Sequence, residues 1–539
     1  MRTAPHAEPC PPLLTAYSPA CPEAQDLSSG RTDHTGKDSP AAAMGFSTLL
    51  LFLSLTGLSW SCLDPNSAYR ITGAVCRLTY PAALALNEKT TSVIEAAFQH
   101  ARYPNMAGES SFFLGKVHYN LSNLEIHDLS IGGSRVELKE NDHIGLSISN
   151  VSAVFQGTIL YGYGSWLIGF GHSVDFEIES NIDLVVNPRL HCGNGKVAAD
   201  TSDCYLTFHK LQLLLQGDRE PGWLKRLFTD FVTFTVKMVV KSQICKEINK
   251  LADILADFIQ HTAENFLSDG DIGVDISVTA PPVITSNYIE SYHKGVTHYH
   301  NMTAVINASV FTPARLTEDR MLYFWFSDDL LEPLVKVAHL DGRYECSITG
   351  PELLDLFKVD LSTAKPALLE ELLSTEAPEL KVRSVTDPHL WTTAQGTFVR
   401  GTASVELTGG LGTPPLSFKA EVKVLVTASY ADKKLILRVK CPQSAPREQC
   451  ISILEQSVSP KTLQDGQLEY LREAVEKIGI PKITSYLETG ITVLMNKQGL
   501  DLFDIINPVV LPQEGYVVVQ VDFGFPHHLL VDFLKKTLE

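Results

Sequence analysis

Apolar and polar residues follow two different periods along this chain. Residues 114–216 read mostly as strands, in which apolar residues occupy alternate positions, as at Ile144, Leu146 and Ile148. A period of two predicts strands with one apolar face and one wet face. Two more runs share this alternation: Val174, Phe176, Ile178, and Ile182, Leu184, Val186.

A helical period separates the strand-rich blocks. Apolar residues three and four positions apart predict amphipathic helices, the longest over 222–265, where Leu224, Leu227, Phe231 and Phe234 begin a stripe. A run of that length is expected to lie across a sheet. The other predicted helices cover 81–102, 328–338 and 464–497.

The order helix, strands, long helix, strands occurs twice, which predicts two α+β domains of similar design. The second copy has strands over 380–440, a turn at 409–415 and a strand over 509–523. We place the N-terminal domain at 62–300, a linker at 301–320 and the C-terminal domain at 321–525.

The first 61 residues do not read as part of either domain. Residues 1–43 are rich in Pro, Ser and Thr, and we interpret them as an upstream extension before a start at Met44. Residues 44–61 predict a signal peptide, with an apolar stretch over Leu49–Leu58 and a cut before Cys62. We therefore expect a secreted, extracellular protein.

The composition of the chain limits the classes of partner that it is expected to bind. The sequence has 539 residues, 44% of them apolar, and a formal net charge of −18. Such an acidic chain is not expected to bind nucleic acid or to dock electrostatically on anionic membranes. Neutral or zwitterionic partners are compatible with it.

Cysteines and sequons fit a secreted protein. Eight cysteines follow the predicted cut, too few for a disulfide-dominated fold of this length, and no CxxC pair suggests a metal site. Cys441 and Cys450 close a short hydrophilic loop and predict a local bridge. Four sequons predict glycosylation sites: Asn120, Asn150, Asn301 and Asn307.

Motifs for chemistry are missing from the sequence. It contains no G-x-S-x-G, no H-E-x-x-H and no phosphate-binding G-x-x-x-x-G-K-[ST]. His293, His298 and His300 lie close together, but we favour a polar strand and loop over a metal site. The apolar faces of strands and helices are therefore the main functional signal. They fit a packed core and a ligand cavity equally well.

Five ordered blocks resemble a known family. They are "GDREPGWLKRLF" (217–228), "SDGDIGVDIS" (268–277), "RMLYFWFSD" (320–328), "LFDIINP" (502–508) and "FGFPHHLLVDFL" (523–534). The chain resembles the lipid-transfer and lipopolysaccharide-binding protein family, which includes bactericidal/permeability-increasing protein. The resemblance extends from about Cys62 to Leu538.

The resemblance implies a fold and an activity. The implied fold is an elongated boomerang of two tandem barrels, each a twisted antiparallel sheet with a long helix, joined by a central sheet. An apolar tunnel would hold cholesteryl ester and triglyceride, with phosphatidylcholine at its openings. The implied activity is exchange of these lipids among high-density, low-density and very-low-density lipoproteins in plasma. It would be performed by a monomer without catalysis, cofactor or metal.

Two alternatives remain open. The first is phospholipid transfer or lipopolysaccharide binding on the same fold, although endotoxin binding needs basic residues that suit phosphates and the chain is acidic. The second is a secreted lipase or esterase, which would need a nucleophile and its base. A serine-reactive probe would reveal such an enzyme.

The resemblance also implies site residues. Cys204 and Cys245 would form the family's bridge and leave Cys192 free. Thr262 stands where the family has an arginine beside the phospholipid headgroup, and 441–456 resembles an insertion. The implied lipid-contacting residues are Cys76, Leu78, Leu86, Gln260, Ala263, Ser291, His293, Phe324 and Phe503.

The C-terminal segment 526–539 predicts an amphipathic helix that begins at Pro526. By resemblance it would be a lid over the N-terminal tunnel mouth. We expect deletion of 527–539 to lower neutral-lipid transfer while secretion and fold are retained; loss of secretion would instead identify plain core. The lid face would consist of Leu529, Leu530, Phe533, Leu534 and Leu538.

Overall fold

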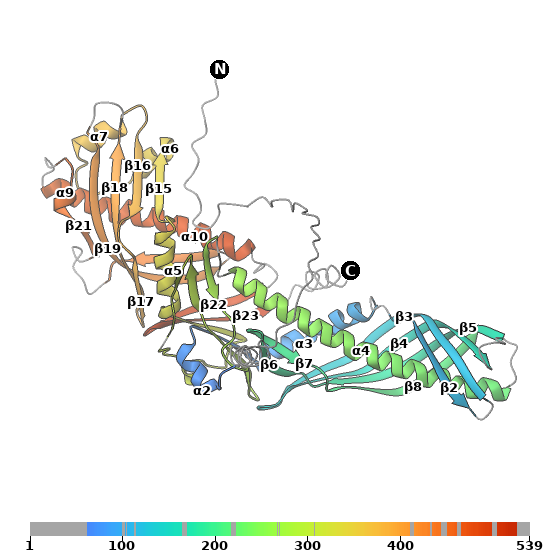
Figure 1. The fold of residues 1–539 in the computed structure, drawn as a ribbon. Coiled ribbons are helices and arrows are strands. Elements are labelled where there is room, and N and C mark those ends of the chain that lie inside the picture. The colour runs from blue at the N-terminus through green and yellow to red at the C-terminus, as the bar shows by residue number, and fades with distance from the viewer. Residues whose placement is uncertain are drawn as a thin grey trace, which may run out of the picture.

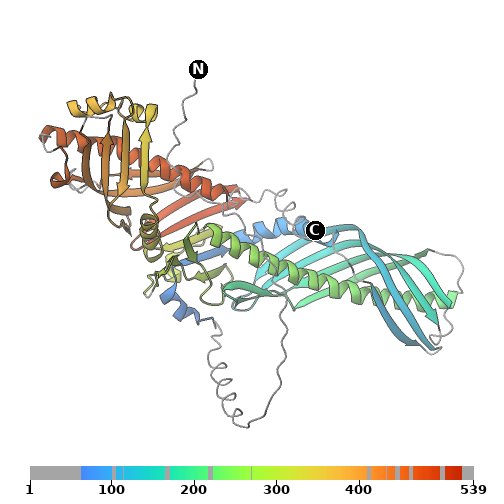
Figure 2. The ribbon, with the colours of Figure 1, turned by 45° about the horizontal axis from the view of Figure 1, so that its top comes forward.

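The protein is elongated and bent, with two arms that meet at a central sheet (Figures 1 and 2). The fold is α+β and all its sheets are antiparallel. The computed structural model describes residues 62–99, 103, 105–112, 115–163, 170–216, 222–266, 268, 270–306, 308–409, 414–431, 434–442, 450–460, 465–497 and 504–524.

The N-terminal arm is a curled sheet with one long helix along it (Figure 2). The helix α4 runs from Gly222 to Phe266, as predicted from its apolar stripe. Its Val236, Val239 and Val240 are buried against inward-facing strand residues such as Phe155. The sheet has the order β2 (Met106–Phe112), β3 (Gly115–Leu138), β4 (Ile144–Tyr163), β5 (Phe170–Val186), β8 (Cys204–Gln216).

The two alternating runs predicted around residue 180 belong to one strand, β5. Ser180 interrupts the apolar pattern, yet its side chain points into the core with Ile178 and Ile182. Its hydroxyl donates to the carbonyl of Ala153 at 2.9 Å, which satisfies the buried polar group. The sequence pattern alone could not show this partner, which lies on β4.

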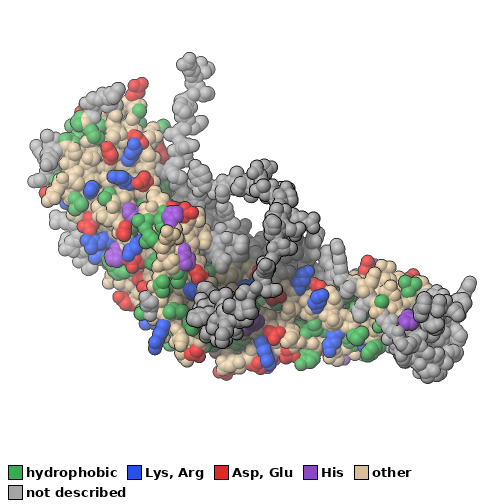
Figure 3. Space-filling model, in the orientation of Figure 1, with side chains coloured by type: hydrophobic (Ala, Val, Ile, Leu, Met, Phe, Trp, Pro, Cys, Tyr) green, Lys and Arg blue, Asp and Glu red, His purple; other side chains and the backbone are tan. Residues whose placement is uncertain are grey.

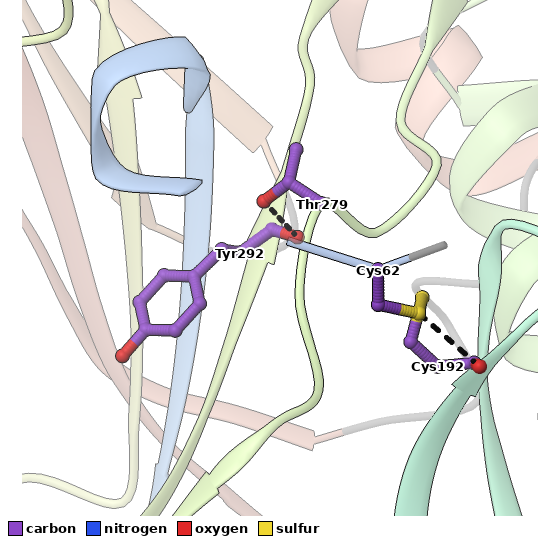
Figure 4. Close-up of a disulfide and its surroundings, with 4 residues drawn as sticks. All are labelled: Cys62, Cys192, Thr279 and Tyr292. Carbon is purple, nitrogen blue, oxygen red and sulfur yellow. Dashed lines mark hydrogen bonds between the residues drawn. A yellow bond between two sulfur atoms is a disulfide. The ribbon is translucent and has the colours of Figure 1, made fainter. Parts of the chain in front are cut away.

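Disulfides tie distant parts of this arm together. Cys204 in β8 is bonded to Cys245 in α4, the pair implied by the family resemblance. The expectation that Cys192 is free is wrong, because Cys192 is bonded to Cys62 across 130 positions (Figure 4). Such a separation carries no signal in sequence, since only the fold brings the two Cα atoms to 6.1 Å. Cys192 lies in the hairpin of β6 (Arg189–Gly193) and β7 (Lys196–Asp200).

The C-terminal arm repeats the plan with a seven-stranded sheet and a long helical region. Cys441 and Cys450 form a disulfide beside this sheet. Two short helices, α6 (Gly350–Leu356) and α7 (Ala367–Leu373), supply Leu353, Leu369 and Leu372 to the core. The strands are β15 (Glu345–Thr349), β16 (Glu379–Ser384), β17 (His389–Thr393), β18 (Gly396–Thr408), β19 (Leu416–Ala431), β20 (Lys434–Lys440) and β21 (Ile451–Ile453).

The helix predicted over 464–497 is interrupted. It consists of α9 (Asp465–Ala474), a π-helical turn over Val475–Gly479 and α10 (Ile480–Lys497). Pro481 follows the turn and has no backbone N–H to donate to the preceding turn. A wider turn just before a proline accommodates that lost hydrogen bond.

The central sheet combines strands from both ends of the chain, in the order β10, β11, β1, β14, β23, β22. The single strand predicted over 509–523 is a hairpin of two strands, because Gly515 adopts a positive φ of 80° in the turn between them. The strands are β1 (Ala74–Thr79), β10 (Val283–Ile284), β11 (Tyr288–His293), β14 (Leu322–Ser327), β22 (Asp504–Gln513) and β23 (Tyr516–Gly524).

The segment expected to be a linker, 301–320, packs against one face of the central sheet. Its Phe311 and Leu316 are buried against Trp325 and Tyr292. Next to it lie a small sheet and the helix α5, whose first residue follows β14 directly. These elements are β9 (Ile272–Asp275), β12 (Val296–Tyr299), β13 (Met302–Thr303) and α5 (Asp328–Leu340).

Candidate functional site

The two faces of the central sheet are covered unequally. On one face, Arg77, Tyr292 and Trp325 are fully buried beneath Phe311 and Leu316. On the other face, Cys76, Leu78 and Phe324 are only half-buried. Since successive residues of a strand point to opposite faces, the strand register decides which residues share the half-buried face.

The half-buried face brings together five of the residues expected to contact lipid. In one row across the strands, Ser291 pairs with Cys76 and Cys76 with Phe324. Leu78 is two positions along β1 and His293 two positions along β11, so both lie on the same face. The structure therefore joins residues that lie more than 200 positions apart in sequence.

The same face contains apolar residues that the sequence analysis did not single out. The ring of Phe326 is nearly parallel to that of Phe324, with centroids 6.2 Å apart. Ile289, Leu322 and Val519 complete the rows by their pairing with Leu78 and Phe324. The period of two in "LYFWF" carried this signal, because Leu322, Phe324 and Phe326 occupy alternate positions.

Ser291 and His293 supply the polar side-chain atoms of this face, and they form a hydrogen bond with each other. The Nδ1 atom of His293 lies 2.8 Å from the carbonyl of Ile276, which can only accept, so Nδ1 holds the proton. Nε2 then accepts from the Ser291 hydroxyl at 2.9 Å. Burial lowers the pKa of His293 below its usual 6.5, so the ring is neutral at pH 7.

Cys76 is also uncharged. Burial, with a smaller contribution from Glu290, raises the pKa of its thiol to about 12. A thiol with this pKa is a small apolar side chain rather than a nucleophile or metal ligand at neutral pH. The half-buried face is therefore an apolar surface whose polar groups are neutral and paired.

His293 should contribute to a loss of stability in mild acid. The histidine binds a proton near pH 6.5 in the unfolded protein and only at lower pH in the folded protein. Its contribution to stability therefore declines as pH falls from neutrality through the folded pKa. His293→Gln should show a flatter dependence of the unfolding midpoint on pH. The exposed His127→Gln is the matched control and should retain the wild-type slope. Equal slopes in wild type and His293→Gln would contradict the assignment.

Other expected site residues lie beside the sheet or outside the described part. Leu86 is half-buried in α3 (Tyr80–Gln99), a helix that contacts β1 and β23. Gln260 is half-buried near the C-terminal end of α4. Four other assignments lie outside what the structure describes: Phe503, Asn307, the side chain of Ala263 and the segment 526–539 with its five lid residues.

A second apolar space lies in the N-terminal arm, between the sheet and α4. Its cavity volume is only about 20 Å³, and every residue lining it is apolar. Phe155 of β4, Ile182 of β5 and Ile244 of α4 are among them. This volume is far below the roughly 300–1,000 Å³ typical of small-molecule pockets. A small-molecule ligand would therefore fit into this space only if the lining side chains moved.

The described residues do not provide a metal centre or a complete catalytic triad around Ser291. No group of three or more His, Cys, Asp or Glu among them could hold a metal ion. Ser291 does donate to His293, but the other ring nitrogen of His293 faces a carbonyl rather than a carboxylate. Among the helices that the structure describes, none is long and apolar enough to cross a membrane.

Charged side chains are dispersed over the visible surface. Figure 3 shows lysine and arginine interspersed with aspartate and glutamate along both arms, with scattered apolar side chains between them. The arrangement on this face does not form a large region of one sign. It suits neither a nucleic-acid groove nor a strongly basic endotoxin site.

Two arms joined by a central sheet with a half-buried apolar face define a protein whose site suits an apolar ligand. Comparison with known proteins supports this class. Residues 83–258 match the N-terminal domain of the LBP/BPI/CETP family. The chain is 44% identical to the cholesteryl ester transfer protein of Gallus gallus, over 92% of this chain and 99% of that protein.

Two further relatives differ in how similar they are to this chain. The cholesteryl ester transfer protein of Homo sapiens is 43% identical, with 90% of this chain and 99% of that protein covered. The phospholipid transfer protein of Mus musculus is 20% identical, with 84% and 90% covered. The chain belongs to the LBP/BPI/CETP family.

Proposed function

We propose that this chain transfers neutral lipids, chiefly cholesteryl esters and triglycerides, between lipoprotein particles without a chemical step. The similarity to cholesteryl ester transfer proteins over nearly their whole length supports this function. High-density, low-density and very-low-density lipoproteins are the proposed partners, in an extracellular setting, and the acting species is a monomer. The bound molecules are cholesteryl ester, triglyceride and phosphatidylcholine.

The observation that carries the proposal is the half-buried apolar face of the central sheet. A cholesteryl ester leaves its particle only if its apolar surface stays out of water, where exposure costs about 25 cal/mol per Å². Cys76, Leu78 and Phe324 offer a surface of matching polarity. The proposal extends this contact surface to Leu86, Gln260, Ala263, Ser291, His293 and Phe503, with the segment 526–539 as lid.

No covalent step is required, because the lipid is the same molecule before and after transfer. Net flux then follows the concentrations of each lipid in donor and acceptor. The neutral Ser291–His293 pair suits this role, since a charged group on the face would have to be desolvated against each lipid. The Ser291 hydroxyl and the His293 imidazole are hydrogen-bonded, and neither group is charged.

The direct test follows labelled cholesteryl ester in high-density particles mixed with low-density acceptors. Purified protein should move the label to the acceptors and return triglyceride when the acceptors contain it. Label that stays with the donors would refute neutral-lipid transfer. A parallel assay with labelled phosphatidylcholine identifies a phospholipid transfer protein, if that label alone moves.

The hydrogen bond from Ser291 to His293 makes an esterase worth testing on the same preparation. A serine-reactive fluorophosphonate should leave the protein unlabelled, because the imidazole lacks a carboxylate partner. Labelling that is lost in Ser291→Ala, together with released fatty acid, would identify a hydrolase in place of a carrier.

The sequons should differ in occupancy. Asn301, Met302 and Thr303 are all exposed, so a glycan at Asn301 would extend into solvent. Asn120 lies in β3 between β2 and β4, with its side-chain oxygen buried. In protein from a secreting eukaryotic host, Asn301→Gln should remove one glycan by mass spectrometry, and Asn120→Gln should leave the mass of the glycans unchanged. The reverse result would contradict this assignment.

A further inference from the structure

The outward face of α4 exposes two large apolar side chains one turn apart. Phe234 is 65% exposed and Met238 is 46% exposed, although the intervening Thr235 and Val236 are each only 1% exposed. Residues four apart lie on the same side of a helix, so Phe234 and Met238 form one projection. Single exposed apolar residues are common, but a phenylalanine and a methionine together form a patch.

Two lysines occupy the same face as this projection. At 100° per residue, Lys237 and Lys241 lie within a quarter turn of Phe234. Among the described residues, no carboxylate lies within 4.0 Å of either ammonium group. Lys241 is exposed, and the Nζ atom of Lys237 lies 5.8 Å from the centre of the Phe208 ring. We name Phe234, Lys237, Met238 and Lys241 the α4 patch.

This positive charge is local. Between Thr233 and Lys250 the helix has four lysines and one glutamate, in a chain whose net charge is −18. The glutamate, Glu247, lies 3.9 Å from Lys250, outside the α4 patch. Within the part of the chain that the structure describes, the patch therefore combines two apolar side chains with two lysines that have no carboxylate partner.

This combination suits a phospholipid surface. Lysine ammonium groups attract lipid phosphates, while phenylalanine and methionine enter the boundary between headgroups and acyl chains. A helix lying along the flank of an arm, as α4 does in Figure 2, could contact such a surface along its length. A second copy of the chain is a poor occupant, because a two-fold contact would bring the lysines of both copies together.

We propose that the α4 patch docks this protein on the phospholipid surface of a lipid particle, with a preference for surfaces that carry negative charge. This inference builds on the proposed function, because a transfer protein must meet the surface of the particle that supplies its lipid. It adds the place of contact, which lies on the N-terminal arm and away from the central sheet.

Vesicle co-flotation tests the docking surface with the full-length chain. The wild type should bind phosphatidylcholine vesicles and bind more tightly when phosphatidylserine is added. Phe234→Ser with Met238→Ser should weaken binding to both vesicles about tenfold or more, since the two apolar side chains that enter the lipid are lost. Lys237→Gln with Lys241→Gln should lower affinity for the phosphatidylserine vesicles by about fivefold for each lysine.

Matched controls come from the C-terminal arm. Leu354→Ser with Val359→Ser removes two apolar side chains of 43% and 45% exposure, and Lys419→Gln with Lys434→Gln removes two exposed lysines. Both controls should bind vesicles like the wild type. All variants should unfold at the wild-type temperature, because every altered side chain except Lys237 is substantially exposed.

The outcomes separate this inference from the proposed function. If the Phe234/Met238 variant bound vesicles as tightly as the wild type, the proposed docking surface would be wrong. Cholesteryl ester transfer by the same preparation would still support the proposed function. A wild-type dimer that the variant converts to a monomer, with vesicle binding unchanged, would also overturn the docking surface and identify a second copy as the occupant. Weak vesicle binding by the patch variants with normal binding by the controls would support it, whichever lipid is transferred.

Discussion

Phe324→Asp should lower the rate of cholesteryl ester transfer at least about tenfold while most of the protein stays folded. Phe324 lies at the middle of the half-buried face, paired with Cys76 on one side and Val519 on the other. A carboxylate there would be left without a partner against an apolar lipid. The desolvation of an unpaired polar or charged group costs several kcal/mol, and about 1.4 kcal/mol already gives a factor of ten.

Two comparisons make this prediction specific. Phe324→Leu keeps the face apolar and should retain most of the transfer activity. Trp325 is adjacent in sequence but 0% exposed on the opposite face, so Trp325→Ala should lower stability by about 3–5 kcal/mol without singling out lipid binding. Initial transfer rates normalised to the folded fraction, measured by circular dichroism, check both. Full activity in folded Phe324→Asp would show that this face does not contact the lipid.

Arg77→Met should destabilise the protein by about 3–5 kcal/mol, the usual cost of breaking a buried ion pair from one side. The Nε atom of Arg77 donates to Glu290 at 2.6 Å, and both side chains are almost fully buried. The two Nη atoms donate to the carbonyls of Leu316 and Pro313, each at 2.8 Å. One side chain therefore joins the central sheet to the segment that covers it.

The variant should also acquire a distinctive pH dependence. Burial raises the pKa of Glu290 even in the wild type, where Arg77 opposes the rise. Without Arg77 the folded pKa rises further above the unfolded value of 4.5, so the stability linked to protonated Glu290 is present below that value and is lost as pH rises through the folded pKa. Arg77→Met should therefore be more stable in mild acid than in mild base, relative to the wild type.

Urea unfolding at two pH values checks the prediction, and a double variant controls for it. Arg77→Met with Glu290→Leu removes both charges and should recover part of the loss, because no buried carboxylate remains unpaired. Arg77→Met with wild-type stability at neutral pH would show that the covering segment does not depend on this pair.

Much of the secondary structure could be predicted from local patterns. The stripe that begins at Leu224 identified α4, because the period of a helix that packs on a sheet repeats within the sequence. The errors occurred where one residue changes the local backbone or finds a distant partner. Pro481 follows a π-helical turn, Gly515 forms a hairpin turn, and Ser180 enters the core through a bond to Ala153.

The candidate site depended much more on tertiary structure. Family resemblance pointed to Cys76, Ser291 and Phe324, but their proximity follows from pairing among β11, β1 and β14. Phe326 belongs to the same face by alternation, yet alternation cannot tell which face is covered. That difference arises because the segment containing Phe311 and Leu316 packs on one side of the sheet.

By itself, the sequence determined the two-part α+β plan, the long helix and the alternating strands, because periodic burial of apolar residues is a local property. Only the tertiary structure decided that Cys62 is bonded to Cys192 and that one face of the central sheet is left half-buried. It also decided that Phe234 and Met238 face outward, although they lie on a helix predicted from its apolar stripe. Long-range strand pairing and burial depend on which distant segments pack against each other, and the spacing of residues along the chain does not predict that packing.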